Sequence, residues 1–241
     1  MTVYIVGGSS AARKETKYRP ETAWAERFPD CFTNPELVRN LAVNDIDVVR
    51  YAASEEFLQL RGSLKSGDWL FVDFAGDDAV PAGFGGYRGS SVKDIAMFEY
   101  GVDAIVDAAQ TASAVPVLLT PVARRRFDGN GVLTDTDTVR SASVRKIAAR
   151  RNAPLIDLYA RTYALLAEWG PLRSRSLYLH GRRGELVNYP QGVDDDAHLN
   201  GTGAEIVARM VADGIRSLGL TLADQLREVG RPIAVPMMAV R

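Results

Sequence analysis

Three polar residues near the two ends of the chain have the types and spacing of a nucleophilic site. Ser9 follows the short apolar run 3–6 and lies on a turn that begins with two glycines, which let a backbone bend sharply. Asp195 and His198 are three residues apart near the other end. That spacing lets a carboxylate bind one imidazole nitrogen while the other nitrogen faces a nucleophile.

Each piece taken alone has other interpretations. A Gly-Gly-Ser-Ser turn after a strand also fits a phosphate-binding loop or a plain turn. A dinucleotide fingerprint would need glycines at the positions of Ser9 and Ala12, and the turn is not followed by the Lys-Ser or Lys-Thr pair of a P-loop. The acidic run 194–196 could be a surface loop with one histidine or a metal site, although its spacing is not that of an EF-hand.

The elements that must position these residues follow from hydrophobic patterning. Apolar runs without clean alternation predict buried parallel strands at 3–6, 46–50, 69–74, 115–120 and 154–158. Amphipathic stretches predict helices at 34–41, 54–64, 92–112, 138–151, 158–169 and 203–218, the last capped by Asn200. This alternation predicts one doubly wound α/β domain, 1–230, with a tail at 231–241. Sites in such sheets form at the carboxyl ends of the strands, and the glycine-rich segment 79–91 is predicted to be a loop there.

Five segments, in this order along the chain, carry a resemblance to a known family. They are the serine block 6–11, the run 64–74, the run 115–125 with its paired arginines, the strand 154–158 and the block 195–204. Together they resemble the SGNH, or GDSL, hydrolases, in their rhamnogalacturonan acetylesterase-like branch. The resemblance implies a three-layer α/β/α sandwich with a five-stranded parallel sheet, flavodoxin-like in order. It also implies a cofactor-free serine esterase for acetylated carbohydrates, with Ser9 as nucleophile, His198 as general base and Asp195 as its partner.

The sequence departs from the family pattern at three places. Gly8 stands where an aspartate normally precedes the nucleophile, and the second block has no clear glycine, so we expect the Ala53 amide to serve as oxyanion donor. Asp77, followed by Asp78, replaces an asparagine that donates to the oxyanion. An ionised carboxylate cannot donate, and losing one such donor costs about 10²–10³ in rate. Asp77 is therefore neutral, or another donor serves, or the reaction is not ordinary ester hydrolysis.

Arg124 and Arg125 follow the fourth predicted strand. One interpretation is that they anchor the substrate or the site. The other is a salt bridge to Asp78 or to a neighbouring carboxylate.

Composition limits the partners. The formal net charge is −1, which gives no basic field for nucleic acid or an anionic membrane, so the expected partner is a small-molecule ester. We expect no metal and no cofactor; Cys31, the only cysteine, is predicted to be a structural thiol. The sequence carries no signal for an oligomeric state. The first residues enter a strand without the regions of a signal peptide, which predicts a cytoplasmic location.

The leading functional prediction is a serine esterase that deacetylates a small intracellular compound or carbohydrate. Two alternatives stay open at this point. The same nucleophile could serve an acyltransferase or another specialised biosynthetic reaction. The degenerate blocks could also belong to a binding protein without catalysis, although such a protein has no need of Ser9, Asp195 and His198 together.

Overall fold

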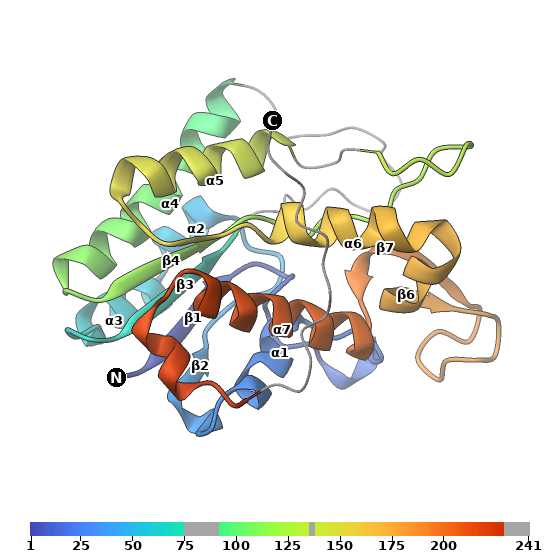
Figure 1. Ribbon diagram of the computed structural model, residues 1–241, viewed down its shortest axis with the longest axis horizontal. Coiled ribbons are helices and arrows are strands. Elements are labelled where there is room, and N and C mark those ends of the chain that lie inside the picture. Colours follow the sequence, from blue (N-terminus) through green and yellow to red (C-terminus); the bar gives the residue numbers. More distant parts are fainter. Residues whose placement is uncertain (75–91, 135–137, 229–241) are drawn as a thin grey trace. The chain divides into compact units, whose positions relative to one another are not determined.

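A computed structural model describes residues 1–74, 92–134 and 138–228 of the chain (Figure 1). The predicted loop 79–91 and tail 231–241 lie outside these residues, and the domain bounds 1–230 stay a prediction. The chain forms two compact units, each assembled from separate segments. Unit 1 consists of Met1–Ala12, Glu36–Pro121 and Asp137–Ile156, and unit 2 of Arg13–Pro35, Val122–Thr136 and Asp157–Arg241.

Unit 1 is built on a five-stranded parallel sheet with the order β2-β1-β3-β4-β5. The strands are β1 (Val3–Gly7), β2 (Val38–Asn40), β3 (Trp69–Asp73), β4 (Val115–Leu119) and β5 (Leu155–Ile156). β1 pairs with β3 along its whole length, so that Gly7 at its end lies opposite Asp73. This is the strand order of flavodoxin. The predicted α/β fold with a five-stranded parallel sheet is therefore confirmed.

The helices of unit 1 pack on the sheet through one apolar core (Figure 1). They are α2 (Val48–Ala52), α3 (Glu55–Ser63), α4 (Val92–Thr111) and α5 (Thr138–Arg151). Val72 of β3 and Leu118 of β4 meet Ile105 of α4 and Ile147 of α5 in this core. All five residues of β3 are buried, as expected for a parallel strand that is covered on both faces.

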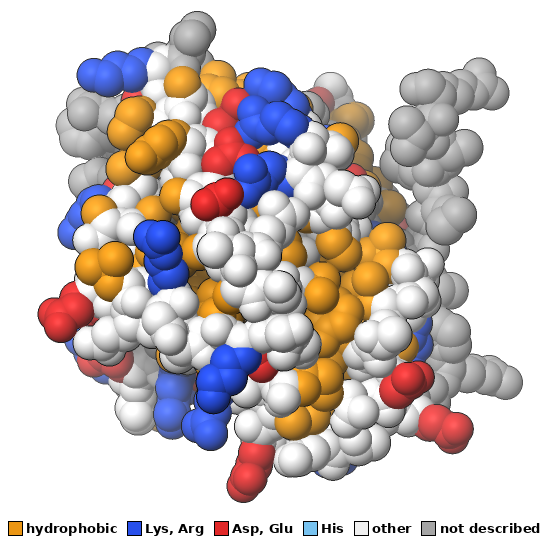
Figure 2. All heavy atoms as spheres, turned by 90° about the vertical axis from the view of Figure 1, so that its left-hand side faces the viewer, with side chains coloured by type: hydrophobic (Ala, Val, Ile, Leu, Met, Phe, Trp, Pro, Cys, Tyr) orange, Lys and Arg blue, Asp and Glu red, His pale blue; other side chains and the backbone are white. Residues whose placement is uncertain are grey.

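The exposed sides of α4 and α5 are joined by ion pairs. Lys146 lies 3.0 Å from Glu99, and Arg151 lies 2.9 Å from Asp107. Exposed pairs of this kind contribute at most about 1 kcal/mol each. On the face of the molecule shown in Figure 2, acidic and basic side chains stand next to each other in mixed groups.

Two elements of unit 1 differ from the prediction. The segment 46–50, predicted as a strand, lies mostly in α2, because the Asp47 side chain caps this helix by accepting from the N–H groups of Val49 and Arg50. The segment 34–41, predicted as a helix, contains the 3₁₀ turn Pro35–Leu37 and then β2. Pairing with the edge of β1 decides the conformation of this short stretch, which local periodicity cannot reveal.

Unit 2 has a core of aromatic and aliphatic side chains. Trp24 of α1 (Trp24–Arg27) packs edge-to-face on Phe28, and Phe28 on Phe32. The remaining helices are η1 (Thr16–Tyr18), η2 (Phe28–Cys31), α6 (Leu158–Arg173), η4 (Ser174–Leu177), α7 (Gly201–Ser217) and η5 (Thr221–Gln225). Asn200 caps α7 as predicted. α6 is interrupted at Gly170 (φ 65°), followed by Pro171, so the predicted end at 169 marks its regular part.

Unit 2 also contains an antiparallel hairpin that the sequence did not predict. It consists of β6 (Tyr178–Gly181) and β7 (Val193–Leu199). β7 is largely acidic and has no apolar alternation, so its pattern does not indicate a strand. Among the described helices of both units, none has the length and apolar character required to cross a bilayer.

Candidate active site

The turn that carries Ser9 is fixed by backbone contacts at the end of β1. A Cβ atom on Gly7 would lie 2.4 Å from the Asp73 carbonyl oxygen, so only glycine allows this approach. The Gly8 N–H donates to the same oxygen at 3.0 Å. The Gly8 carbonyl then accepts from the N–H groups of Ala11 and Ala12, at 3.1 and 3.0 Å. Ser9 thus sits in a closed turn at the carboxyl end of β1.

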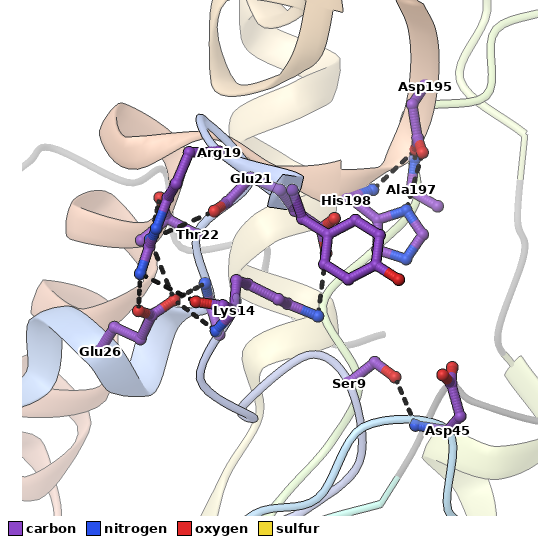
Figure 3. Close-up of polar contacts among 12 residues, drawn as sticks. Ser9, Lys14, Arg19, Glu21, Thr22, Glu26, Asp45, Asp195, Ala197 and His198 are labelled. Atoms are coloured by element: carbon purple, nitrogen blue, oxygen red, sulfur yellow. Dashed lines mark hydrogen bonds and ion pairs between the residues drawn. The ribbon is translucent and has the colours of Figure 1, made fainter. Parts of the chain in front are cut away.

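The Ser9 hydroxyl is oriented by a loop that follows β2. The backbone N–H of Asp45 donates to Ser9 Oγ at 3.0 Å, and Figure 3 shows the Asp45 carboxylate beside Ser9. Asp45 has a φ of 57°, a left-handed conformation that costs a non-glycine residue energy and often marks a functional position. Ser9 is 5% exposed. A backbone N–H beside the serine oxygen lies close to where the oxyanion of an attacked ester would form.

A buried carboxylate supports the same turn. Asp73, at the end of β3, is 1% exposed, and its Oδ2 accepts from the Ser10 hydroxyl at 2.9 Å. The Asp73 backbone and side chain therefore both hold residues next to Ser9.

Asp195 and His198 form a directed pair on β7 in unit 2. His198 Nδ1 lies 2.7 Å from Asp195 Oδ2. Asp195 Oδ1 accepts from the N–H groups of Ala197 and His198, at 2.7 and 2.9 Å (Figure 3). This geometry leaves Nε2 of His198 as the nitrogen available for proton transfer.

The pair shifts the proton affinity of both members. Burial disfavours the ionised form of Asp195, but its hydrogen bonds with the His198 ring and with two backbone N–H groups prevail and lower its pKa to about 2. The hydrogen bond with Asp195 raises the pKa of His198 above its ordinary value of 6.5, although burial opposes this. Asp195 is therefore ionised over the whole neutral range, and His198 is a stronger base than a free imidazole.

A buried ion pair lies within electrostatic reach of His198. Lys14 Nζ is 2.9 Å from Glu21 Oε1, with side chains that are 6% and 11% exposed. The negative charge of Glu21 raises the pKa of His198, and the positive charge of Lys14 lowers it. Figure 3 shows Lys14 and Glu21 on the loop next to His198, and a β-bridge joins Glu21 to Asn200.

The structure places the other predicted site residues differently. The N–H of Ala53 donates within the end of α2, to the Val49 carbonyl at 3.2 Å, and it is the N–H of Asp45 that donates to Ser9. Asp77 and Asp78 lie outside the described residues. Arg124 is exposed. Arg125 pairs with Asp196, which is the alternative of a salt bridge to a neighbouring carboxylate.

Sequence reasoning therefore missed several residues of the site. A turn-prone Asn-Asp pair at 44–45 was the available signal for Asp45. No local signal marks Asp73, or the pairing of Lys14 with Glu21, because these contacts depend on the tertiary fold.

The predicted reactive groups belong to different units. Ser9 belongs to unit 1, and Asp195 and His198 belong to unit 2. The structure brings Asp195 and His198 together, and their union with Ser9 belongs to the proposal below. Within the parts of the chain that the structure describes, no cluster of histidine, cysteine and acidic side chains could hold a metal ion.

Comparison with known proteins identifies relatives. No protein-family model matches the chain. It is 31% identical over 224 residues to the rhamnogalacturonan acetylesterase RhgT of Bacillus subtilis, and the match covers 93% of both chains.

Solved structures show the same fold. The chain is similar to the protein YXIM of B. subtilis with a TM-score of 0.73 and 21% identity, over 91% of this chain and 57% of that one; it thus spans little more than half of that protein. A member of the lipolytic G-D-S-L family from Veillonella parvula is similar with a TM-score of 0.56 and 12% identity, over 88% and 96%. These similarities confirm the predicted α/β/α fold class.

Proposed function

Because the chain belongs to the SGNH (GDSL) superfamily of carboxylic ester hydrolases, in the rhamnogalacturonan acetylesterase branch, we propose that it is a serine esterase that removes acetyl groups from a carbohydrate or another small acylated compound. The observation that carries the proposal is the 2.7 Å contact between His198 Nδ1 and Asp195 Oδ2. This contact leaves Nε2 as the site of proton transfer. The relative's name supports an acetylated carbohydrate as the substrate class. The cytoplasmic location and an intracellular substrate stay predictions from the sequence.

In the proposed reaction, Ser9 Oγ attacks the ester carbonyl carbon while His198 Nε2 takes the serine proton. Asp195 holds the imidazole in the required tautomer and stabilises the imidazolium. The tetrahedral intermediate collapses as the C–O bond breaks, and His198 gives the proton to the leaving alcohol. Water then attacks acetyl-Ser9 with the same base, which releases acetic acid and returns the proton to Ser9.

The oxyanion would be stabilised by the backbone N–H of Asp45. This N–H lies 3.0 Å from Ser9 Oγ, and in the reaction it would donate instead to the carbonyl oxygen of the ester bonded to Ser9. Asp45 thus takes the role that we predicted for Ala53. The roles of Asp77, Asp78 and Arg124 stay predictions.

The proposal is tested by hydrolysis of p-nitrophenyl acetate across a pH range, with Ser9→Ala as the test variant and Ser10→Ala as its matched control. We expect Ser9→Ala to abolish activity. We expect Ser10→Ala to lower it far less, with a loss of stability, because the turn that carries Ser9 loses the hydrogen bond from Ser10 to the buried Asp73 carboxylate.

The pH profile gives a second test. Activity requires neutral His198, and its pKa is raised, so the acid limb of kcat/KM should have its midpoint above pH 6.5. If the wild type and Ser9→Ala hydrolyse p-nitrophenyl acetate at equal rates, Ser9 is not the nucleophile and the proposal is wrong.

A further inference from the structure

The Asp195–His198 pair sits in an irregularity of the β6–β7 hairpin. Leu179 lies opposite Asp195, but the next β6 residue towards the N-terminus, Tyr178, lies opposite Leu199. Three residues of β7, 196–198, therefore have no partner on β6 and bulge out of the ladder. A bulge of this size needs contacts of its own to hold one conformation.

The second histidine of the chain supplies such contacts. His180 has a side chain that is only 5% exposed, with Nδ1 2.6 Å from Asp194 Oδ1 and Nε2 3.0 Å from Asp196 Oδ1. Among the described residues, neither nitrogen has a partner with hydrogen-bond alignment, so these are close approaches of the ring to the two carboxylates. The two carboxylates flank Asp195 in the sequence on either side. His180 thus contacts the residue that precedes the catalytic pair and the first residue of the bulge.

Arg125 holds the bulge from a different segment of unit 2. Its backbone N–H donates to the Asp196 carbonyl at 2.8 Å, and its guanidinium binds the Asp196 carboxylate. The same guanidinium binds the Ser174 hydroxyl at 3.2 Å and the Pro171 carbonyl. This side chain is 12% exposed. Asp196 is therefore contacted by His180 on one side and bound on the other by Arg125, whose guanidinium is largely buried and also bonded to Ser174 and Pro171.

We propose that His180 is a positioning residue, which acts through Asp194 and Asp196 to fix the bulge of β7 so that Asp195 meets His198 in the productive orientation. The inference rests on the proposed function, because it assigns a purpose to that orientation. Without His180, the carboxylates of Asp194 and Asp196 would lose the group between them.

The bulge links this cluster directly to the catalytic pair. Asp195 Oδ1 accepts from Ala197 N–H and His198 N–H, so the backbone of the bulge sets the direction of the carboxylate. A displacement of about 1 Å in a catalytic group can cost about 100-fold in rate. A looser bulge lowers kcat without removing any group that touches the substrate.

The test compares the wild type with His180→Gln. We expect kcat for p-nitrophenyl acetate to fall about 10- to 100-fold, with KM changed less than about twofold. The matched control is Lys146→Gln, which breaks an exposed ion pair with Glu99 in unit 1 and should leave both constants unchanged.

A readout besides activity comes from NMR. The chain has two histidines, so His180→Gln leaves only the His198 ring to titrate. The hydrogen bond with Asp195 raises the pKa of His198, Glu21 adds to this and Lys14 opposes it. A weakened pair should therefore let this pKa fall back towards 6.5, and the acid limb of kcat/KM should move to lower pH by the same amount. Lost stability alone would not move either value.

Asp194→Asn serves as a second variant if His180→Gln does not fold. Asp194 is 74% exposed, so its substitution should be tolerated, and it should shift the His198 pKa and kcat in the same direction by less. If a folded His180→Gln or Asp194→Asn protein keeps the wild-type kcat and His198 pKa, the positioning role is wrong while the esterase proposal stands. If the His198 pKa falls but Ser9→Ala proves as active as the wild type, the positioning role stands and the esterase proposal falls.

Discussion

The contribution of the Asp195 carboxylate to folding and to the reaction can be tested together with Asp195→Asn. The pKa of this carboxyl group is lowered from 3.8 to about 2, and its side chain is 27% exposed. By linkage this difference corresponds to about 2.5 kcal/mol of stability for the ionised form. Asparagine keeps an oxygen for the N–H groups of Ala197 and His198 but loses the charge that His198 binds.

The pH dependence of this stability has a defined sign. A lowered carboxyl pKa stabilises the fold above 3.8, and the effect is lost as the pH falls through about 2. The raised pKa of His198 stabilises the fold below 6.5 and is lost as the pH rises through the folded-state value. The free energy of unfolding of the wild type should therefore exceed that of Asp195→Asn by the largest amount near pH 5, where Asp195 is ionised and His198 is protonated.

Urea unfolding at pH 3, 5 and 8 measures this difference, and Asp213→Asn is the control. Asp213 pairs with Arg216 at 3.0 Å on α7, and both side chains are about a third exposed, so its loss should cost under about 0.5 kcal/mol. In p-nitrophenyl acetate hydrolysis, Asp195→Asn should lower kcat by about 10³–10⁴, because the imidazole adopts the wrong tautomer. An equal stability gap at all three pH values, or a kcat within tenfold of the wild type, would refute this account of the pair.

Three further variants test how the site is held. Asn200→Ala removes two N-cap bonds to α7 and two bonds to backbone carbonyls; urea unfolding should show a loss of about 2–4 kcal/mol. Gly203→Ala places a Cβ atom 2.1 Å from the Leu177 carbonyl oxygen, so the same measurement should show a loss of about 3 kcal/mol or more, unless the backbone yields freely. Asp45→Val forces a β-branched residue into a left-handed conformation. The resulting shift of the N–H that contacts Ser9 should lower kcat/KM about tenfold or more. Asp45→Asn, the control, should lower kcat/KM far less.

The turn at Ser9, the contact of Asp195 with His198 and the cap at Asn200 could be predicted from sequence because their signals are local, whereas the order of the sheet was implied by the family resemblance. A buried run followed by glycines predicts the turn at Ser9, and a fixed spacing predicts the contact of Asp195 with His198. Asn200 is a cap whose partners lie two and three residues further along. In each case the chemistry and its evidence lie within a few residues.

The supporting residues could not be predicted, because their partners are remote in sequence. Asp45 reaches Ser9 from the loop after β2, and Asp73 reaches Ser10 from the neighbouring strand. A salt bridge of Arg125 to a carboxylate was one of the two predicted roles, but its partner Asp196 lies 71 residues away and could not be named. The β6–β7 hairpin also depends on tertiary pairing, because β7 is an acidic segment without strand propensity that becomes a strand by pairing with β6.

Because the segments of the two units alternate along the chain, the residues of the proposed site are synthesised at different times. Every segment of unit 1 is synthesised by Ile156, whereas Asp195 and His198 come with the last segment of unit 2. A growing chain can therefore complete the sheet and the turn that presents Ser9 while it still lacks a base. If the esterase proposal holds, the serine is in place early and its activation waits for the final stretch of synthesis.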